Sequence, residues 1–182
     1  MMTFMELAVA RQSVRRYSTK KVEAAKLDLC VEAARLAPSA SNGQPWRFIL
    51  VDEDELKDKV AKACIGPGSS FNRFAAGAPV LIALVIERST GLNRIGAAIK
   101  RRNYPLIDIG IAAEHFCLQA AELGLGTCMM GWFDERKIKR LLAVPATLRI
   151  GLVISLGYPD EADASRPKLR KGLEAIFGRN RY

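Results

Sequence analysis

The chain has 182 residues, of which 49% are hydrophobic and 26% are charged, and these values fit one soluble globular domain with a sizeable core. No apolar run approaches the roughly 18–20 residues of a membrane-spanning helix, and the N-terminus lacks the pattern of a signal peptide, so we expect a cytoplasmic protein. The net charge of +9 favours an anionic partner, either nucleic acid or a phosphate-bearing cofactor or substrate.

The first part of the chain is predicted to alternate helices and strands. Thr3 and Glu6 have the spacing of a capping box, which predicts a helix near residues 3–12. A second helix carries apolar residues at helical spacing and must stop near Pro38, because the residue before a proline avoids the helical region. Residues 46–51 read as a short strand, and residues 52–64 as an exposed helix with acids in its first turn.

The second part continues with loop-rich residues 66–79, a strand at 80–86, and a surface excursion at 87–104 without clean periodicity. A long, mostly apolar helix at 105–124 belongs in a core or a subunit interface. A turn or short strand, a helix capped by Asp134, and a buried strand within 148–159 follow, and the tail looks extended and basic. This mixture predicts an α+β or α/β fold of three layers, in one domain spanning residues 1–182.

Several kinds of site are not supported by the sequence. The cysteines Cys30, Cys64, Cys117 and Cys128 are scattered, and with the single His115 they offer no metal-ligand spacing. We expect buried free thiols, a structural histidine and no metal. The chain has no GxGxxG fingerprint and no P-loop. It also lacks the motifs of nucleic-acid-binding domains, which argues against nucleic acid as the anionic partner.

The positive charge is concentrated in residues 11–21, 88–102 and 165–182, each with a net charge of +5. In the first cluster Arg11, Ser13 and Arg15 alternate, so their side chains share one side of an extended chain. Two guanidinium groups and a hydroxyl that converge in this way suit a phosphate. The alternative is a solvated basic turn. Lys168 and Arg170 repeat the alternation near the C-terminus, where the alternative is a disordered basic tail.

The stretch "APSASNGQPW" at residues 37–46 carries uncharged polar groups. Ser39, Asn42 and Gln44 offer donors and acceptors that suit the edge of a heterocycle, and Trp46 offers apolar surface. The alternative is a connecting loop in which Asn-Gly makes a turn.

Together these segments resemble the nitroreductase family of FMN-dependent oxidoreductases. The resemblance covers nearly the whole chain and rests on "RQSVRRYS", "AARLAPSASNGQPWRFILV", "GAPVLIALV", "AAELGLGTCMMGWFDERKIKRLLAVP", "LGYP" and "KLRKGLEAI", in that order. It implies a three-layer α/β/α sandwich with a mostly antiparallel sheet, in an intertwined homodimer with FMN at the interface. It also implies a ping-pong reaction, in which NADH or NADPH reduces the flavin and a nitroaromatic, a quinone or a related small acceptor then takes the electrons.

The resemblance implies which residues contact the cofactor. Arg11, Gln12, Ser13 and Arg15 match the family's first flavin segment. The other implied contacts are Pro38, Ser39, Ala40, Asn42 and Gln44 from the partner subunit, Asn72 at the pyrimidine edge, Met129, Met130 and Gly131 beside N5, and Lys168 and Arg170 over the phosphate. No catalytic side chain is implied, because the flavin N5 carries the hydride.

Two features depart from the family pattern. Met130 stands where some members have a glutamate, and the chain between residues 87 and 105 leaves little room for a helical excursion over the flavin. Two other functions stay open from the sequence: a flavin-binding protein that senses or stores flavin with little turnover, and a nucleic-acid-binding protein. Steady-state oxidation of a reduced nicotinamide separates the first from a reductase. A colourless protein with salt-dependent DNA binding would indicate the second.

Overall fold

A computed structural model describes residues 2–66, 71–87, 103–163 and 165–182. Within these ranges the regular elements are, in chain order, α1 (Phe4–Ala10), α2 (Ala24–Arg35), the 3-10 helix η1 (Ala40–Asn42), β1 (Trp46–Val51), α3 (Asp54–Cys64), the 3-10 helix η2 (Arg73–Gly77), β2 (Val80–Ile86), α5 (Tyr104–Glu122), β3 (Gly126–Met130), α6 (Glu135–Leu141), β4 (Arg149–Gly157) and the 3-10 helix η3 (Leu173–Ala175).

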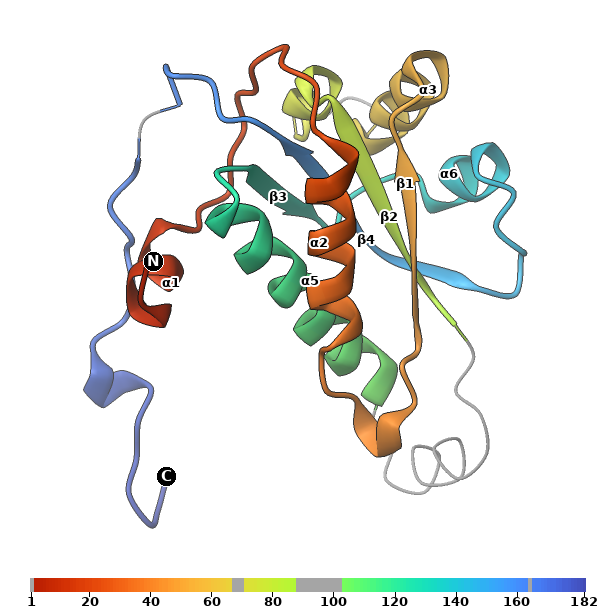
Figure 1. Ribbon diagram of the computed structural model, residues 1–182. Helices are drawn as coiled ribbons and strands as arrows, with labels where there is room; N and C mark the ends of the chain where they lie inside the picture. The colour runs from red at the N-terminus through yellow and green to blue at the C-terminus, as the bar shows by residue number, and fades with distance from the viewer. Residues whose placement is uncertain (1, 67–70, 88–102, 164) are drawn as a thin grey trace.

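The described strands form one antiparallel sheet in the order β1-β2-β4-β3. Alternate residues of the central strands face opposite sides, as the period of a strand requires. Ile82 and Leu84 of β2 join a core cluster with α2 and α5, whereas Leu81 and Ala83 join a second cluster with α3 and α6. The sheet therefore lies between two helical layers (Figure 1), which confirms the predicted three-layer α+β fold.

Local sequence signals explain where several helices begin and end. The predicted capping box is present, because the Thr3 side chain accepts from Glu6 N and the Glu6 side chain accepts from Thr3 N. The Asp134 side chain caps α6 by accepting from Lys137 N. Helix α5 has Pro105 in its first turn and ends just before Gly124, whose φ of +75° is the left-handed conformation that closes many helices.

Two sequence expectations need revision. The first helix ends at Ala10 rather than near residue 12, because Arg11 turns to an extended conformation. Helix α3 is amphipathic rather than exposed, since Val60 and Cys64 are fully buried in the second core cluster. Residues 126–130, expected to be a turn or a short strand, form the strand β3. The expected excursion at 87–104 falls mainly on residues 88–102, which lie outside the described residues. The second basic cluster consists of these same residues.

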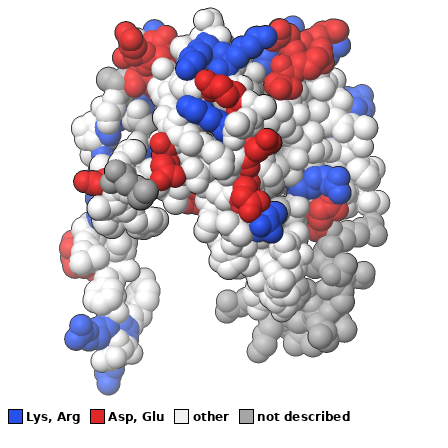
Figure 2. Space-filling model, in the orientation of Figure 1, with Lys and Arg blue, Asp and Glu red and all other residues white. Residues whose placement is uncertain are grey.

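The two ends of the chain lie together on one side of the molecule, away from the sheet (Figure 1). Large apolar side chains are exposed there, on α1 and along the tail: Phe4, Met5, Val9, Leu169, Leu173, Ile176 and Phe177. An exposed apolar surface of this kind is typical of an interface with another chain. Basic side chains lie at the tip of the tail (Figure 2). Of the helices in the described part of the chain, none combines the length and hydropathy needed to cross a membrane.

Candidate functional site

The basic segment, defined as residues 11–15, lies along the first residues of β3. Ser13 forms a parallel bridge with Thr127, and Val14 N donates to Thr127 O at 2.9 Å. Gly126 permits this close approach, because a Cβ added there would lie 2.5 Å from Val14 Cγ2. Val14 is buried and anchors the extended segment, while Ser13 is partly exposed and Arg15 is exposed.

Cationic groups converge on this segment from both ends of the chain. The Lys168 ammonium donates to the Arg11 carbonyl oxygen. Partial burial, together with the nearby charges of Arg11 and Arg170, holds the pKa of Lys168 below its ordinary value. The contribution of Arg11 and Arg170 to this lowering of the pKa shows that like charges lie close together, an arrangement that an anion would relieve.

Arg11 has a polar atom that its own chain does not satisfy. Its Nε lies 3.2 Å from Glu114 Oε1, yet it is a buried side-chain nitrogen without a hydrogen-bond partner within the described residues. The distance qualifies as an ion pair, but the direction of the N–H does not make a hydrogen bond. A buried donor left in this state is costly unless a ligand completes it. The site therefore favours an anionic ligand on chemical grounds.

The far end of β3 is joined to the same region through Asn72. This residue adopts a left-handed conformation, with φ of 62°, and its amide nitrogen donates to Trp132 O at 2.7 Å and to Cys64 O at 3.3 Å. Arg15 lies over the ring of Phe74, with 5.8 Å from Cζ to the centroid. The sequence-predicted residues around Asn72, Gly131 and Arg15 are therefore brought to one side of the molecule.

The side chains of Met129 and Met130 do not line this region. Met130 is buried in the core cluster that contains α3 and α6, and Met129 packs against the cluster on the opposite face of the sheet. What β3 offers is its backbone, because it is the edge strand of the described sheet, and on its open side the structure describes only the bridge from Ser13 to Thr127. An apolar Met130 side chain beside the ligand, as the sequence suggested, is not what the structure shows.

The amide loop, defined as residues 38–44, has hydrogen bonds within itself. Ser39 Oγ accepts from Gln44 N at 3.0 Å, and the Gln44 amide nitrogen donates to Asn42 Oδ1 at 3.0 Å. Ser41, Asn42 and Gln44 have φ of 48°, 54° and 43°. Non-glycine residues in this conformation cost on the order of 1 kcal/mol or more each and cluster at functional sites. The loop is therefore more than a simple connection between α2 and β1.

One buried carboxylate anchors the amide loop to the body of the protein. Asp108, on the first turns of α5, is 5% exposed, and its Oδ1 accepts from Ala40 N at 3.1 Å. Sequence reasoning missed Asp108, because an acid within an apolar helix does not reveal which loop it contacts. Its isolation in the run "PLIDIGIAA" is the signal that could have marked it.

The structure brings together one set of predicted site residues and leaves the other apart. Arg11, Gln12, Ser13, Arg15 and Lys168 meet at the start of β3, with Arg170 exposed nearby. The amide loop lies at the opposite end of α2 and α5 (Figure 1). Within the described part of one chain, these two sets do not form a single cavity.

The remaining chemically active side chains have structural environments. All four cysteines are free and buried, and burial raises the pKa of the Cys30, Cys64 and Cys117 thiols to about 12. His115 Nδ1 lies 2.9 Å from the Ile111 carbonyl oxygen one helical turn earlier. Across the ranges that the structure describes, no group of His, Cys, Asp and Glu side chains could hold a metal ion.

The chain is similar to known proteins over most of its length. The family model described as "Nitroreductase family" matches residues 8–70 and 68–158. A protein of Archaeoglobus fulgidus named for NADH dehydrogenase/NAD(P)H nitroreductase is 30% identical, over 87% of each chain. The iodotyrosine deiodinase of Thermotoga neapolitana is 26% identical, over 90% of this chain and 92% of its own. The structure of an FMN-dependent nitroreductase from Clostridium difficile has a TM-score of 0.78 and 27% identity, covering 98% of this chain and 100% of its own.

Proposed function

The chain belongs to the nitroreductase family of oxidoreductases, and we propose that it binds FMN and uses NADH or NADPH to reduce small electron acceptors in a ping-pong reaction. Nitroaromatics and quinones are the acceptor classes proposed. The observation that carries the proposal is the contact of Lys168 with Arg11 of the basic segment, together with a buried Arg11 Nε that makes no hydrogen bond within the described residues.

The basic segment fits the phosphate of FMN. A phosphate monoester has a charge of about −1.5 to −2 near neutral pH. Arg11 and Lys168 meet at one point, and Arg15 and Arg170 add positive charge nearby. Ser13 would add a hydroxyl donor. Charge-assisted hydrogen bonds of this kind are the strong ones, and one of them would give the Arg11 Nε the hydrogen bond that it lacks within the described residues.

Other residues fit the ring system. When bound, FMN supplies the hydride chemistry, and the protein supplies position and electrostatics. Because both donor contacts of the Asn72 amide nitrogen go to backbone carbonyls, its Oδ1 is the atom left to accept from an N–H on the pyrimidine edge. The contact with Trp132 O holds the backbone just after β3, where main-chain N–H groups would face the reactive edge.

We propose a homodimer in which the amide loop of one chain completes the site of the other. Three observations support it: the separation of the two sets of residues, the strained backbone of the amide loop, and the exposed apolar side chains of α1 and the tail. The buried free thiols suit a reducing compartment, and we propose a cytoplasmic location.

The visible spectrum of the purified protein tests the cofactor. We expect an oxidised flavin spectrum that NADH or NADPH bleaches under anaerobic conditions, and that a quinone or a nitroaromatic then restores. A colourless protein that does not take up FMN would refute the proposal. A yellow protein that neither nicotinamide bleaches would instead be a flavin-binding protein that stores or senses flavin. An iodinated tyrosine belongs among the acceptors tested, because of the deiodinase relative.

Complementation between two defective chains tests the shared site. One chain carries Arg11→Ala, and the other carries Ser39→Ala with Asn42→Ala in the amide loop. If each site takes residues from both chains, the mixed dimer contains one intact site and binds FMN at half stoichiometry, although neither parent binds it well. If each site lies within one chain, the mixed dimer stays as defective as its parents.

A further inference from the structure

The chain that leaves β4 folds back onto the basic segment. Ser18 N donates to Tyr158 O at 2.9 Å, Asp160 N donates to Arg16 O at 3.0 Å, and Tyr17 bridges Pro159. Asp160 then makes a tight turn, in which its carbonyl oxygen accepts from Asp163 N at 2.8 Å. This turn returns Asp163 to the side of Arg15.

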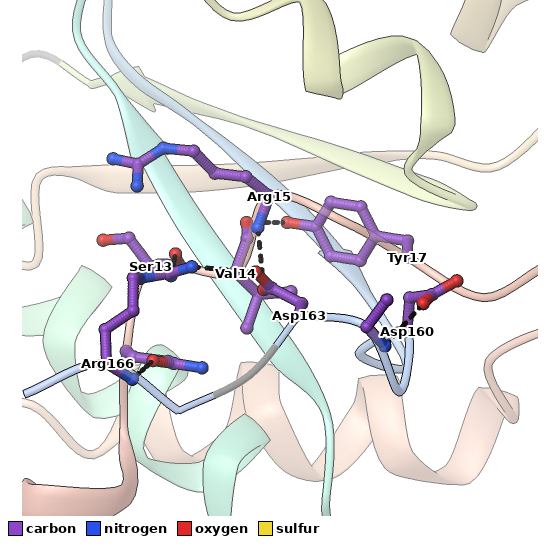
Figure 3. Close-up of polar contacts among 9 residues, drawn as sticks. Ser13, Val14, Arg15, Tyr17, Asp160, Asp163 and Arg166 are labelled. Carbon is purple, nitrogen blue, oxygen red and sulfur yellow. Dashed lines mark hydrogen bonds and ion pairs between the residues drawn. The ribbon is translucent and has the colours of Figure 1, made fainter.

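Asp163 is a buried carboxylate with two contacts. Its side chain is 6% exposed, and it accepts from Arg15 N at 3.2 Å and from Arg166 Nη1 at 2.8 Å. It binds the main chain of Arg15 and not its guanidinium, which extends away from Asp163 in Figure 3. The carboxylate therefore fixes the backbone of Arg15 and leaves the Arg15 side chain to reach elsewhere.

Arg166 holds the two residues that precede Val14. Its Nη2 donates to the Ser13 carbonyl oxygen, and its backbone N donates to Gln12 Oε1 at 3.1 Å. With Nη1 on Asp163, the guanidinium has partners on both terminal nitrogens (Figure 3). Tyr17 completes the arrangement, because its hydroxyl donates to Val14 O at 2.8 Å.

We propose that Asp163 and Arg166 form a clasp that positions the basic segment for a phosphate, so that both are positioning residues for FMN. This inference rests on the proposed function. Arg166 is not assigned as a phosphate ligand, because its guanidinium is already engaged with Asp163 and Ser13. Asp163 cannot be a ligand, because a carboxylate repels a phosphate.

The direction in which Asp163→Ala changes the affinity for FMN distinguishes the clasp from simple electrostatics. Asp163→Ala removes a negative charge close to the phosphate site, so electrostatics alone predicts tighter binding of FMN. The clasp predicts weaker binding, because the Arg15 backbone and Arg166 lose their common partner. The expected loss is about tenfold, the size associated with a hydrogen bond to a charged group. Asp163→Asn keeps an acceptor for Arg15 N, and its loss should be smaller.

The experiment measures the dissociation constants of FMN and riboflavin for each flavin-free variant by flavin fluorescence, together with the melting temperature. Riboflavin lacks the phosphate, so the clasp predicts that Asp163→Ala weakens the binding of FMN much more than the binding of riboflavin. Glu161→Ala is the matched control, since it removes an exposed acid two residues away and should not weaken FMN. Asp163→Ala combined with Arg166→Ala should weaken FMN binding about as much as either substitution alone, because the two residues act as one unit.

Three outcomes would overturn the clasp: unchanged or tighter FMN binding by Asp163→Ala, equal losses for FMN and riboflavin, or additive effects in the double variant. If Asp163→Ala does not fold, Asp163→Asn and Arg166→Ala decide by the same comparison of FMN with riboflavin. A wild-type protein that binds neither flavin would refute the proposed function instead, so the two failures are distinguishable.

Discussion

The basic segment and the amide loop differ in what holds them in place. The basic segment is held by residues far away in sequence, namely Thr127 of β3, Asp163 and Arg166 after β4, and Lys168. The amide loop has hydrogen bonds within itself, keeps three residues at positive φ, and is anchored to α5 by Asp108.

This difference indicates two ways of preparing a binding surface. The basic segment brings like charges together, and a network of fixed partners keeps them in place. The amide loop carries no charge, and its shape is built into the backbone in a strained form. If the two surfaces bind opposite parts of one cofactor, changes in the basic segment should distinguish FMN from riboflavin, and changes in the loop should not.

The largest effect expected from a single charge is that of Arg11→Ala. Losing a charge-assisted hydrogen bond of about 1.5–3 kcal/mol should raise the dissociation constant of FMN by roughly 10- to 150-fold. The affinity for riboflavin should change little, because riboflavin has no phosphate. Titration of the flavin-free protein with each flavin measures both values.

Arg16→Ala is the matched control for Arg11→Ala. Arg16 is an exposed arginine in the same stretch, and the structure assigns contacts to its carbonyl oxygen, which the substitution preserves. If both variants lose FMN equally, the effect is one of total charge, and the specific role of Arg11 is wrong.

An intermediate effect is expected from Asp108→Ala, which removes the anchor of the amide loop. Leaving Ala40 N without its partner costs about 1–3 kcal/mol when the group stays buried. Because the loop has strained residues, part of this cost should appear as a change in loop conformation. Affinity for FMN and for riboflavin should fall together, by roughly tenfold.

Asp108→Asn provides the comparison for this prediction, since its side-chain oxygen can still accept from Ala40 N. We expect Asp108→Asn to retain most of the affinity. A loss of affinity for FMN alone, without a loss for riboflavin, would contradict the assignment of the two surfaces to different parts of the cofactor. It would mean that the amide loop contacts the phosphate. Thermal unfolding without ligand distinguishes a loop effect from a general loss of stability.

Much of the fold follows from local signals in the sequence. Thr3 with Glu6, Asp134 and Gly124 predicted helix ends, and the apolar run at residues 80–86 predicted a buried central strand. The prediction that residues 52–64 form an exposed helix was wrong. The first turns of this helix are charged, but its later turns carry an apolar face that tertiary packing buries. Acids and lysines dominate the start of that helix, whereas its buried alanines and cysteine lie toward its end.

The candidate site was predictable only in part, for a physical reason. Arg11, Ser13 and Asn42 could be proposed from residue type and spacing, because each would contact a ligand through its own side chain. Asp163, Arg166 and Asp108 act on the backbone of other segments. Their partners are set by tertiary folding, and Asp163 contacts a residue 148 positions away, so no local pattern could name them.

The smallest effect concerns Lys168 and the dependence of FMN binding on pH. Partial burial, Arg11 and Arg170 place the pKa of Lys168 below its ordinary value of 10.5. A bound phosphate favours the charged ammonium and raises this pKa. The bound state then holds the proton more tightly than the free state, so affinity is full below the pKa of the free protein and falls as the pH rises through the interval between the two values.

Because the pKa of Lys168 in the free protein lies below the ordinary value of 10.5, FMN binding should weaken as the pH rises toward that value, by at most about tenfold per pH unit. Riboflavin shares the ring but not the phosphate, so the difference between the two flavins removes any titration of the ring itself. Lys168→Arg keeps its charge throughout this rise in pH and should abolish the difference. If the pH dependence of the difference survives Lys168→Arg, the titrating group lies elsewhere, and Lys168 is not the residue that contacts the phosphate.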